Sequence, residues 1–207
     1  MIFKDKITDY VGTTGEYTDA QAKRFMIDGC YDVYKKIIYT KGYDEGLKFG
    51  KWYDISSSVT NIDETRDILL VKRNGTQARI GTAANADKYT DTDSIYYASV
   101  TDPLYYMLAN DLTLLPAPVA GQDNKFLYLP EYSISNYEGT PDSKVQNFPS
   151  EYYEHILTYA TVRILELIHQ DFISNQEDAE LSQVIIGRLD RVKMQYQELF
   201  GIQQQQQ

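Results

Sequence analysis

Apolar residues recur at intervals of three and four in three long stretches of the chain, and this spacing predicts helices. Thr18 and Gln21 precede the first stretch and form a capping box, in which side chain and main chain satisfy each other's hydrogen bonds at a helix start. We therefore predict a helix from Thr18 to about Tyr39, with Gly42 as the stop signal beyond its end. Its apolar stripe consists of Ala22, Phe25, Met26, Gly29, Cys30, Val33 and Ile37.

The C-terminal third carries the other two helical stripes. One covers residues 150–172, with Ser150 as the predicted N-cap. The other opens at a second capping box, Ser174 with Glu177, and continues to Phe200. Because the connection is short, we expect these two long helices to be antiparallel neighbours.

Between the first helix and the later ones, residues 43–100 lose the helical period and carry short runs of β-branched and aromatic residues, which predicts a β-rich region. Asn74-Gly75 accepts the positive φ angles of a tight hairpin turn. The pattern therefore predicts a hairpin over residues 67–80, further strands over 52–59 and 94–100, and a loop over 82–93.

Beyond residue 100 the signals are mixed. Asp102-Pro103 is typical of a helix start, so a short helix is predicted up to Asn110. Two short strands are predicted over residues 112–115 and 125–129, joined by a proline-rich turn. A loop is predicted over residues 136–147.

These elements predict an α+β fold: a bundle of the N-terminal helix, a short helix and two long antiparallel C-terminal helices, with a β-rich insertion. The length of 207 residues favours a single domain. In it, residues 1–42 and 101–200 form the helical core, 43–100 form the insertion, and 201–207 form an extended tail.

Composition narrows the function classes. The formal net charge of −10 disfavours a module that reads DNA, which needs clustered cations. No apolar run approaches the roughly 20 residues that cross a bilayer, and the N-terminus lacks the pattern of a secretory signal, so we expect a chain without a membrane span that is made in the cytoplasm. The 19 tyrosines suit either core filling or protein interfaces.

Candidate chemistry is sparse. Cys30 lies on an apolar helix stripe, where an inert buried thiol is expected. Glu166 and His169 form one ExxH pair, but carboxylate di-iron bundles need two such pairs, so a solvated helix face is the better interpretation. The sequence contains no phosphate-binding loop and no nucleophile motif. We therefore expect no enzyme, no cofactor and no metal site.

Three segments resemble one known family, the head-tail connector (adaptor) proteins of tailed bacteriophages. Residues 103–118 with the strand around Phe126 and Tyr132 are similar to the family's short helix, proline turn and aromatic strand. Residues 148–163 resemble its helix that opens with Phe-Pro, and residues 177–181 its acidic helix start. In style the chain resembles connectors of crAss-like short-tailed phages. It departs from the family at Asn110, where a glycine-like turn is expected, and in its tyrosine content.

The resemblance implies a structural protein of the virion at the head-tail interface. About twelve copies would form a ring that binds the portal protein on one side and the next tail or ring protein on the other. Genomic DNA would pass through the lumen without specific binding, which agrees with an acidic subunit. The segment proposed to dock on the portal comprises Phe200, Gly201, Ile202, Gln203 and Gln204.

Two other functions remain open at the level of sequence. A capsid or tail decoration protein would bind the particle away from the portal. A soluble helical-bundle enzyme or metal bundle would hold metal stoichiometrically. The five terminal glutamines are also compatible with a biased terminus without function.

Overall fold

The computed structural model describes residues 1–12, 16–62, 67–138, 142–175 and 179–201, and the chain divides into two compact units. Met1–Phe49 and Glu131–Gln207 form the first, which we call the helical unit, and Gly50–Pro130 form the second, the β unit. The predicted α+β class is confirmed. The β-rich region is longer than the predicted 43–100, because strands continue to Tyr128, so residues 104–128 belong to the β unit and not to the predicted helical core. The single domain stays a prediction.

The helical unit contains five helices, two 3-10 turns and one hairpin within the described residues. They are α1 (Phe3–Val11), α2 (Asp19–Lys41), α3 (Tyr43–Gly46), η1 (Leu47–Phe49), β9 (Ser133–Ser135), β10 (Lys144–Gln146), η3 (Ser150–Tyr152), α5 (Tyr153–Asn175) and α6 (Ala179–Glu198).

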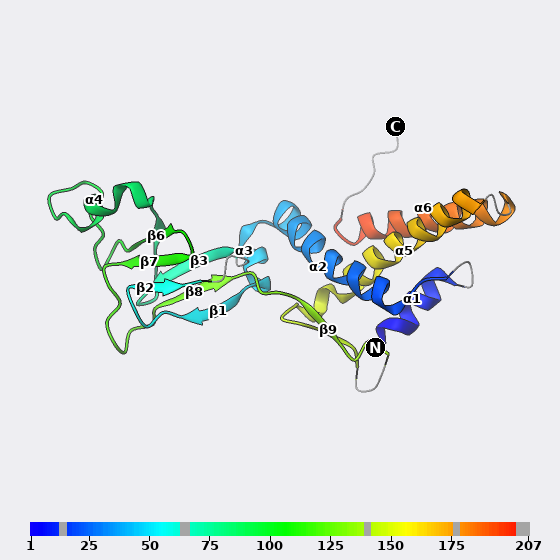
Figure 1. Ribbon diagram of the computed structural model, residues 1–207, viewed down its shortest axis with the longest axis horizontal. Coiled ribbons are helices and arrows are strands. Elements are labelled where there is room, and N and C mark those ends of the chain that lie inside the picture. The colour runs from blue at the N-terminus through cyan, green and yellow to red at the C-terminus, as the bar shows by residue number, and fades with distance from the viewer. Residues whose placement is uncertain (13–15, 63–66, 139–141, 176–178, 202–207) are drawn as a thin grey trace. The chain divides into compact units, whose positions relative to one another are not determined.

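Helix α5 is the centre of the helical unit, since α1, α2 and α6 all pack on it (Figure 1). It is buried on more than the single face predicted, and even Thr158 and Thr161 are fully enclosed. Their hydroxyls donate to the carbonyls four residues earlier, at 2.8 and 2.9 Å, which satisfies them inside the core.

The predicted starts of the long helices have different outcomes. The capping box of α2 is confirmed: Gln21 N donates to Thr18 Oγ1 at 3.2 Å, and Thr18 N donates to Gln21 Oε1 at 2.8 Å. Ser150 is not the predicted N-cap, because it lies inside η3 and makes no capping bond. The second capping box lies partly outside the described residues, at Glu177.

The antiparallel pairing of α5 and α6 is confirmed. Tyr159 packs on Tyr196 with 5.8 Å between ring centroids, and further along α5, Glu166 pairs with Lys193 of α6 at 2.9 Å. Residue numbers therefore rise along α5 while they fall along α6. Helix α1 was not predicted, because its nine residues present only three buried side chains, too few for a clear periodicity.

Over residues 50–62 and 67–130, the β unit holds two four-stranded sheets, one 3-10 turn and one short helix. Its elements are β1 (Lys51–Asp54), β2 (Val59–Asn61), β3 (Ile68–Arg73), β4 (Thr76–Gln77), β5 (Arg79–Ile80), η2 (Ala83–Asn85), α4 (Ala86–Thr90), β6 (Leu104–Leu108), β7 (Asp111–Leu115) and β8 (Lys125–Tyr128). The strand orders are β1-β8-β3-β4 and β2-β7-β6-β5. Both sheets contribute to a core that includes Val71, Leu112, Leu114 and Phe126.

The predicted hairpin at Asn74-Gly75 is confirmed, but it is shorter than the predicted 67–80, because Arg79 and Ile80 form β5 and pair with β6 of the other sheet. Lys72 pairs with Gln77 and Arg73 with Thr76, and the two turn residues have φ of 47° and 79°. The turn therefore has the positive φ angles that a type I′ connection requires.

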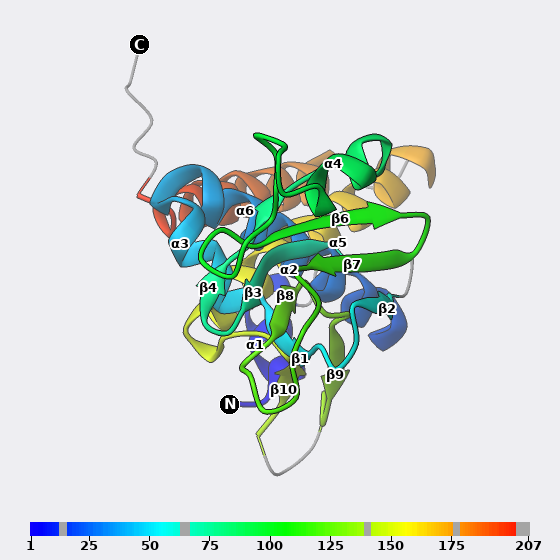
Figure 2. The same ribbon diagram turned by 90° about the vertical axis from the view of Figure 1, so that its left-hand side faces the viewer.

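The short helix predicted up to Asn110 is wrong, because this segment forms strand β6. Every residue from Leu104 to Leu108 pairs with β7, and Ala109 turns the chain with φ of 50° (Figure 2). Paired aromatic and apolar side chains across the two strands outweigh the local helix-start signal of Asp102-Pro103.

Other strand predictions are partly corrected. Strands β7 and β8 exist where predicted but belong to different sheets, and the run over 52–59 is split between β1 and β2. Residues 94–100 form a loop instead of a strand, whereas the loop predicted over 82–93 contains η2 and α4. The loop predicted over 136–147 contains strand β10.

Two helix glycines give a matched test of packing in the helical unit. A Cβ at Gly29 would lie 2.9 Å from Tyr159 Cδ1, whereas a Cβ at Gly187 would meet nothing within 4 Å. We expect Gly29→Ala to lower the free energy of unfolding by about 2 kcal/mol through overpacking. The control, Gly187→Ala, should raise it by roughly 0.5–1 kcal/mol through helix propensity. Urea unfolding followed by circular dichroism measures both, and equal effects would contradict the packing of α2 on α5.

Candidate interaction surface

A small second core in the β unit holds helix α4 and the loop that follows it. Tyr89, Ala98 and Leu104 are buried together, with Tyr106 and Leu115 packed against them. Tyr89 also fixes the chain through polar atoms, because its hydroxyl accepts from Thr82 N at 2.8 Å and its carbonyl accepts from Ala98 N at 2.9 Å. The loop over residues 91–102 is thus anchored at its centre.

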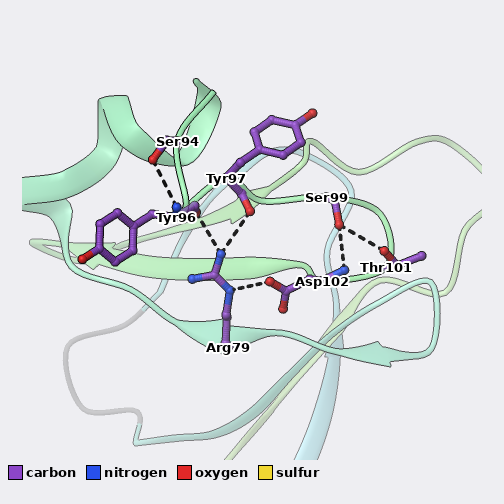
Figure 3. Close-up of polar contacts among 7 residues, drawn as sticks. All are labelled: Arg79, Ser94, Tyr96, Tyr97, Ser99, Thr101 and Asp102. Atoms are coloured by element: carbon purple, nitrogen blue, oxygen red, sulfur yellow. Dashed lines mark hydrogen bonds and ion pairs between the residues drawn. The ribbon is translucent and has the colours of Figure 1, made fainter. Parts of the chain in front are cut away.

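Arg79 on strand β5 ties this loop to the sheet (Figure 3). Its Nη2 donates to the carbonyls of Tyr96 and Tyr97 at 2.8 and 3.1 Å. Its Nε donates to Asp102 Oδ2 at 2.9 Å, which also neutralises the guanidinium. Charge-assisted hydrogen bonds of this kind are stronger than neutral ones. The guanidinium therefore connects the segment at Tyr96 and Tyr97 with the end of the loop at Asp102.

Short side chains complete the loop's hydrogen bonds. Tyr96 N donates to Ser94 Oγ at 3.1 Å and Asp102 N donates to Ser99 Oγ at 3.0 Å, as Figure 3 shows. Asp93 N donates to Asp91 Oδ1 at 3.0 Å. These serine and aspartate turns give the loop a defined backbone conformation without regular secondary structure.

This fixed loop exposes large apolar side chains. Ile95 is 91% exposed, and Tyr96, Tyr97 and Val100 are exposed beside it. Ile80, next to Arg79 on β5, is 74% exposed. We call Ile95, Tyr96, Tyr97 and Val100 the apolar loop surface; Ile80 is not part of it, because it follows Arg79 on the strand and its side chain leaves the opposite face. Exposed apolar side chains on an ordered backbone, with tyrosine prominent among them, are typical of a protein-binding surface.

The candidate chemical groups found in the sequence are engaged in structural roles. Glu166 forms ion pairs with Arg163 and Lys193, as expected for a solvated helix face. Cys30 is buried, and this burial raises the pKa of its thiol. Across the described ranges, no three His, Cys, Asp or Glu side chains gather in a way that could hold a metal ion. No described helix has the length and apolar character to span a membrane.

The predicted portal-docking segment falls in two parts. Phe200 is only 6% exposed and packs edge to face on His155 and Tyr196, with ring centroids 4.9 and 5.2 Å apart. The Phe200 ring therefore packs between α5 and the end of α6 as part of the core of the helical unit. Gly201 is exposed, with φ of 70°, while Ile202, Gln203 and Gln204 lie outside the described residues.

His155 sits beneath Phe200, with its Nε2 3.1 Å from the carbonyl oxygen of Leu199. Since a carbonyl only accepts, the proton belongs on Nε2, and Nδ1 has no hydrogen-bond partner among the described residues. Burial lowers the pKa of His155 below its ordinary value, and the nearby Lys41 ammonium acts in the same direction. The folded protein thus favours the neutral imidazole.

Sequence reasoning missed the apolar loop surface. Arg79 stood inside the predicted hairpin, and residues 94–100 were interpreted as a strand. The available signal was the run of Asp, Ser and Thr on both sides of Ile95, which is typical of side-chain-capped turns. No family model matches the chain, and no curated protein matches it.

Removing the guanidinium tests whether it fixes the loop. We expect Arg79→Met to lower the free energy of unfolding by about 2 kcal/mol, because two carbonyls and one carboxylate lose their donor. Hydrogen exchange at the amides of Tyr96, Tyr97 and Ala98 should accelerate at least about tenfold. Arg24→Met, an exposed arginine on α2, is the control. Unchanged loop exchange in Arg79→Met would contradict this role.

The buried imidazole predicts a pH dependence. The unfolded chain binds a proton at His155 near pH 6.5, but the folded chain binds it only at lower pH. The stability contributed by the neutral ring is therefore present above pH 6.5 and is lost as the pH falls toward the folded pKa. Urea unfolding between pH 7.5 and 5.0 should show this loss in the wild type and in His169→Gln, and a smaller loss in His155→Gln. Parallel curves for all three would refute the assignment.

Proposed function

We propose that this protein is a structural component of a tailed-bacteriophage virion, a head-to-tail connector. Several copies form a ring that joins the portal to the next tail or ring protein and continues the DNA channel. The observation that carries the proposal is the apolar loop surface, which Arg79 holds in one conformation before any partner binds. The resemblance of residues 148–163 and of the proline turn at 116–118 to the connector family supplies the type of assembly, whereas the short helix expected before that turn is strand β6.

A rigid apolar surface suits assembly better than catalysis. Burying exposed Ile95 and the adjacent tyrosines supplies free energy in proportion to the apolar area removed from water. Because the loop is ordered in advance, little of that free energy is lost in ordering it on binding. A subunit with these properties associates without a large rearrangement.

Ring closure sets a further requirement, since copies related by rotation must meet through two different surfaces. The apolar loop surface supplies one of them. The net charge of −10 per copy also supports a channel role, because acidic walls repel the phosphate backbone and let DNA slide. Of the predicted docking segment, Gly201, Ile202, Gln203 and Gln204 remain the proposed link to the portal.

The native mass of the purified protein tests the proposal directly. We expect a closed oligomer of about twelve copies in native mass spectrometry, formed either by the protein alone or on addition of its purified portal. The apolar surface is the physical reason, so the oligomer should persist at salt concentrations that abolish purely ionic contacts.

Two outcomes would contradict the proposal. A protein that stays monomeric and does not bind the portal, but binds assembled capsids or tails, would favour the decoration protein. Stoichiometric metal in the purified protein would favour the helical-bundle enzyme.

A further inference from the structure

The outer side of the first sheet carries an exposed tryptophan between two lysines. Trp52 on β1 is 40% exposed, and the ammonium groups of Lys72 and Lys125 each lie 5.2 Å from its ring centroid. Lys72 on β3 and Lys125 on β8 are paired directly across the two strands. We call Trp52, Lys72 and Lys125 the Trp52 face.

The Trp52 ring attracts both ammonium groups, but it does not remove the repulsion between them. Like charges directly opposite each other on neighbouring strands are destabilising. Lys125 forms an ion pair with Asp123 at 2.9 Å, whereas no ion pair of Lys72 is found among the described residues. The face thus keeps uncompensated positive charge around an exposed aromatic ring, in a protein whose net charge is −10.

The apolar loop surface has the complementary character. Three exposed carboxylates, Asp87, Asp91 and Asp93, lie in or next to the loop, and Lys88 is the one cation in that stretch of sequence. Asp102 does not add to this charge because it pairs with Arg79. Lys88 Nζ lies 5.8 Å from the ring centroid of Tyr96, and the three carboxylates outnumber it, so the loop presents Ile95 and two tyrosines beside an excess of negative charge.

We propose that the apolar loop surface of one copy binds the Trp52 face of the next copy. This inference rests on the proposed function and identifies the two surfaces through which neighbouring copies meet. Ile95 and the tyrosines cover the Trp52 ring, while Asp91 and Asp93 pair with Lys72 and Lys125. Aromatic anchors supply most of the affinity at such contacts, and charge complementarity fixes the orientation.

The two surfaces are different and both belong to the β unit, so the contact is heterologous. Each copy carries one apolar loop surface and one Trp52 face. A growing row of copies therefore has an unoccupied loop surface at one end and an unoccupied Trp52 face at the other, until the ring closes. A single type of contact within the β unit is therefore enough to generate the assembly.

Two charge-reversal variants of the full chain test the contact. Lys72→Glu/Lys125→Glu reverses the charge of the Trp52 face and leaves the apolar loop surface unchanged. Asp91→Lys/Asp93→Lys reverses the charge of the loop and leaves the Trp52 face unchanged. Each variant alone should associate at least about tenfold more weakly than the wild type, because like charges now meet. An equimolar mixture should recover association, because each component supplies the surface that the other lacks.

Lys6→Glu/Lys35→Glu is the matched control. It changes the charge by the same amount on exposed positions of α1 and α2 and should assemble like the wild type. Thermal unfolding of every variant, monitored by circular dichroism, confirms that the changes leave the fold intact. Native mass spectrometry and sedimentation velocity report the association, with and without portal.

The outcomes separate this contact from the proposed function. If the wild type forms rings and the two variants associate equally well, the proposed contact is wrong and the connector function stands. The same holds if the mixture of variants does not recover association. A wild type that never associates, even on the portal, overturns both. If Lys72→Glu/Lys125→Glu assembles normally but loses affinity for double-stranded DNA, the Trp52 face is a nucleic-acid contact and the inference is wrong.

Discussion

Arginine side chains satisfy main-chain carbonyl oxygens at three places where the chain leaves a regular element. Arg188 donates to the carbonyl of Val11 at the end of α1, at 2.6 Å. Arg73 donates to Pro116 and Ala117 after β7, and Arg79 donates to the loop after α4. Carbonyls at such ends lack partners within their own element, and a planar guanidinium can serve two of them at once. The connections of both units are thereby fixed by side chains, and the surface proposed for assembly is one of these connections.

The tyrosines divide between the two uses that composition left open. In the helical unit Tyr152 and Tyr196 pack in a series of ring contacts with Phe49, His155 and Phe200, which fills the spaces around α5. In the β unit Tyr96 and Tyr97 are exposed on a loop. Removing a tyrosine ring from water stabilises in both places. In the helical unit this stabilises the fold itself, whereas the exposed rings of Tyr96 and Tyr97 can be buried only by a partner.

Local signals predicted the parts of the fold that local chemistry determines. The Thr18 capping box, the Asn74-Gly75 turn and the long helical stripes each depend on residues within a few positions of one another, and all three are present in the structure. The segment after Asp102-Pro103 became a strand because β7 pairs with it, and that partner is visible only in three dimensions. The apolar loop surface was missed for a similar reason: Arg79 is well separated in sequence from the carbonyls that it binds. Site prediction failed where a long-range hydrogen bond decides the conformation.

The division of the chain at Phe49 and again at Glu131 has a consequence for how the protein folds. The β unit is one continuous segment, and its first strand pairs with its last, so that Lys51 of β1 lies opposite Tyr128 of β8. The helical unit is built from two separate segments, and α2 meets α5 only after the ends of the intervening segment come together. Closing that large loop costs less chain entropy when the segment is already compact. The β unit precedes α5 and α6 in the chain, and its β1–β8 pairing brings the two ends of the segment together, which shortens the effective loop between α2 and α5.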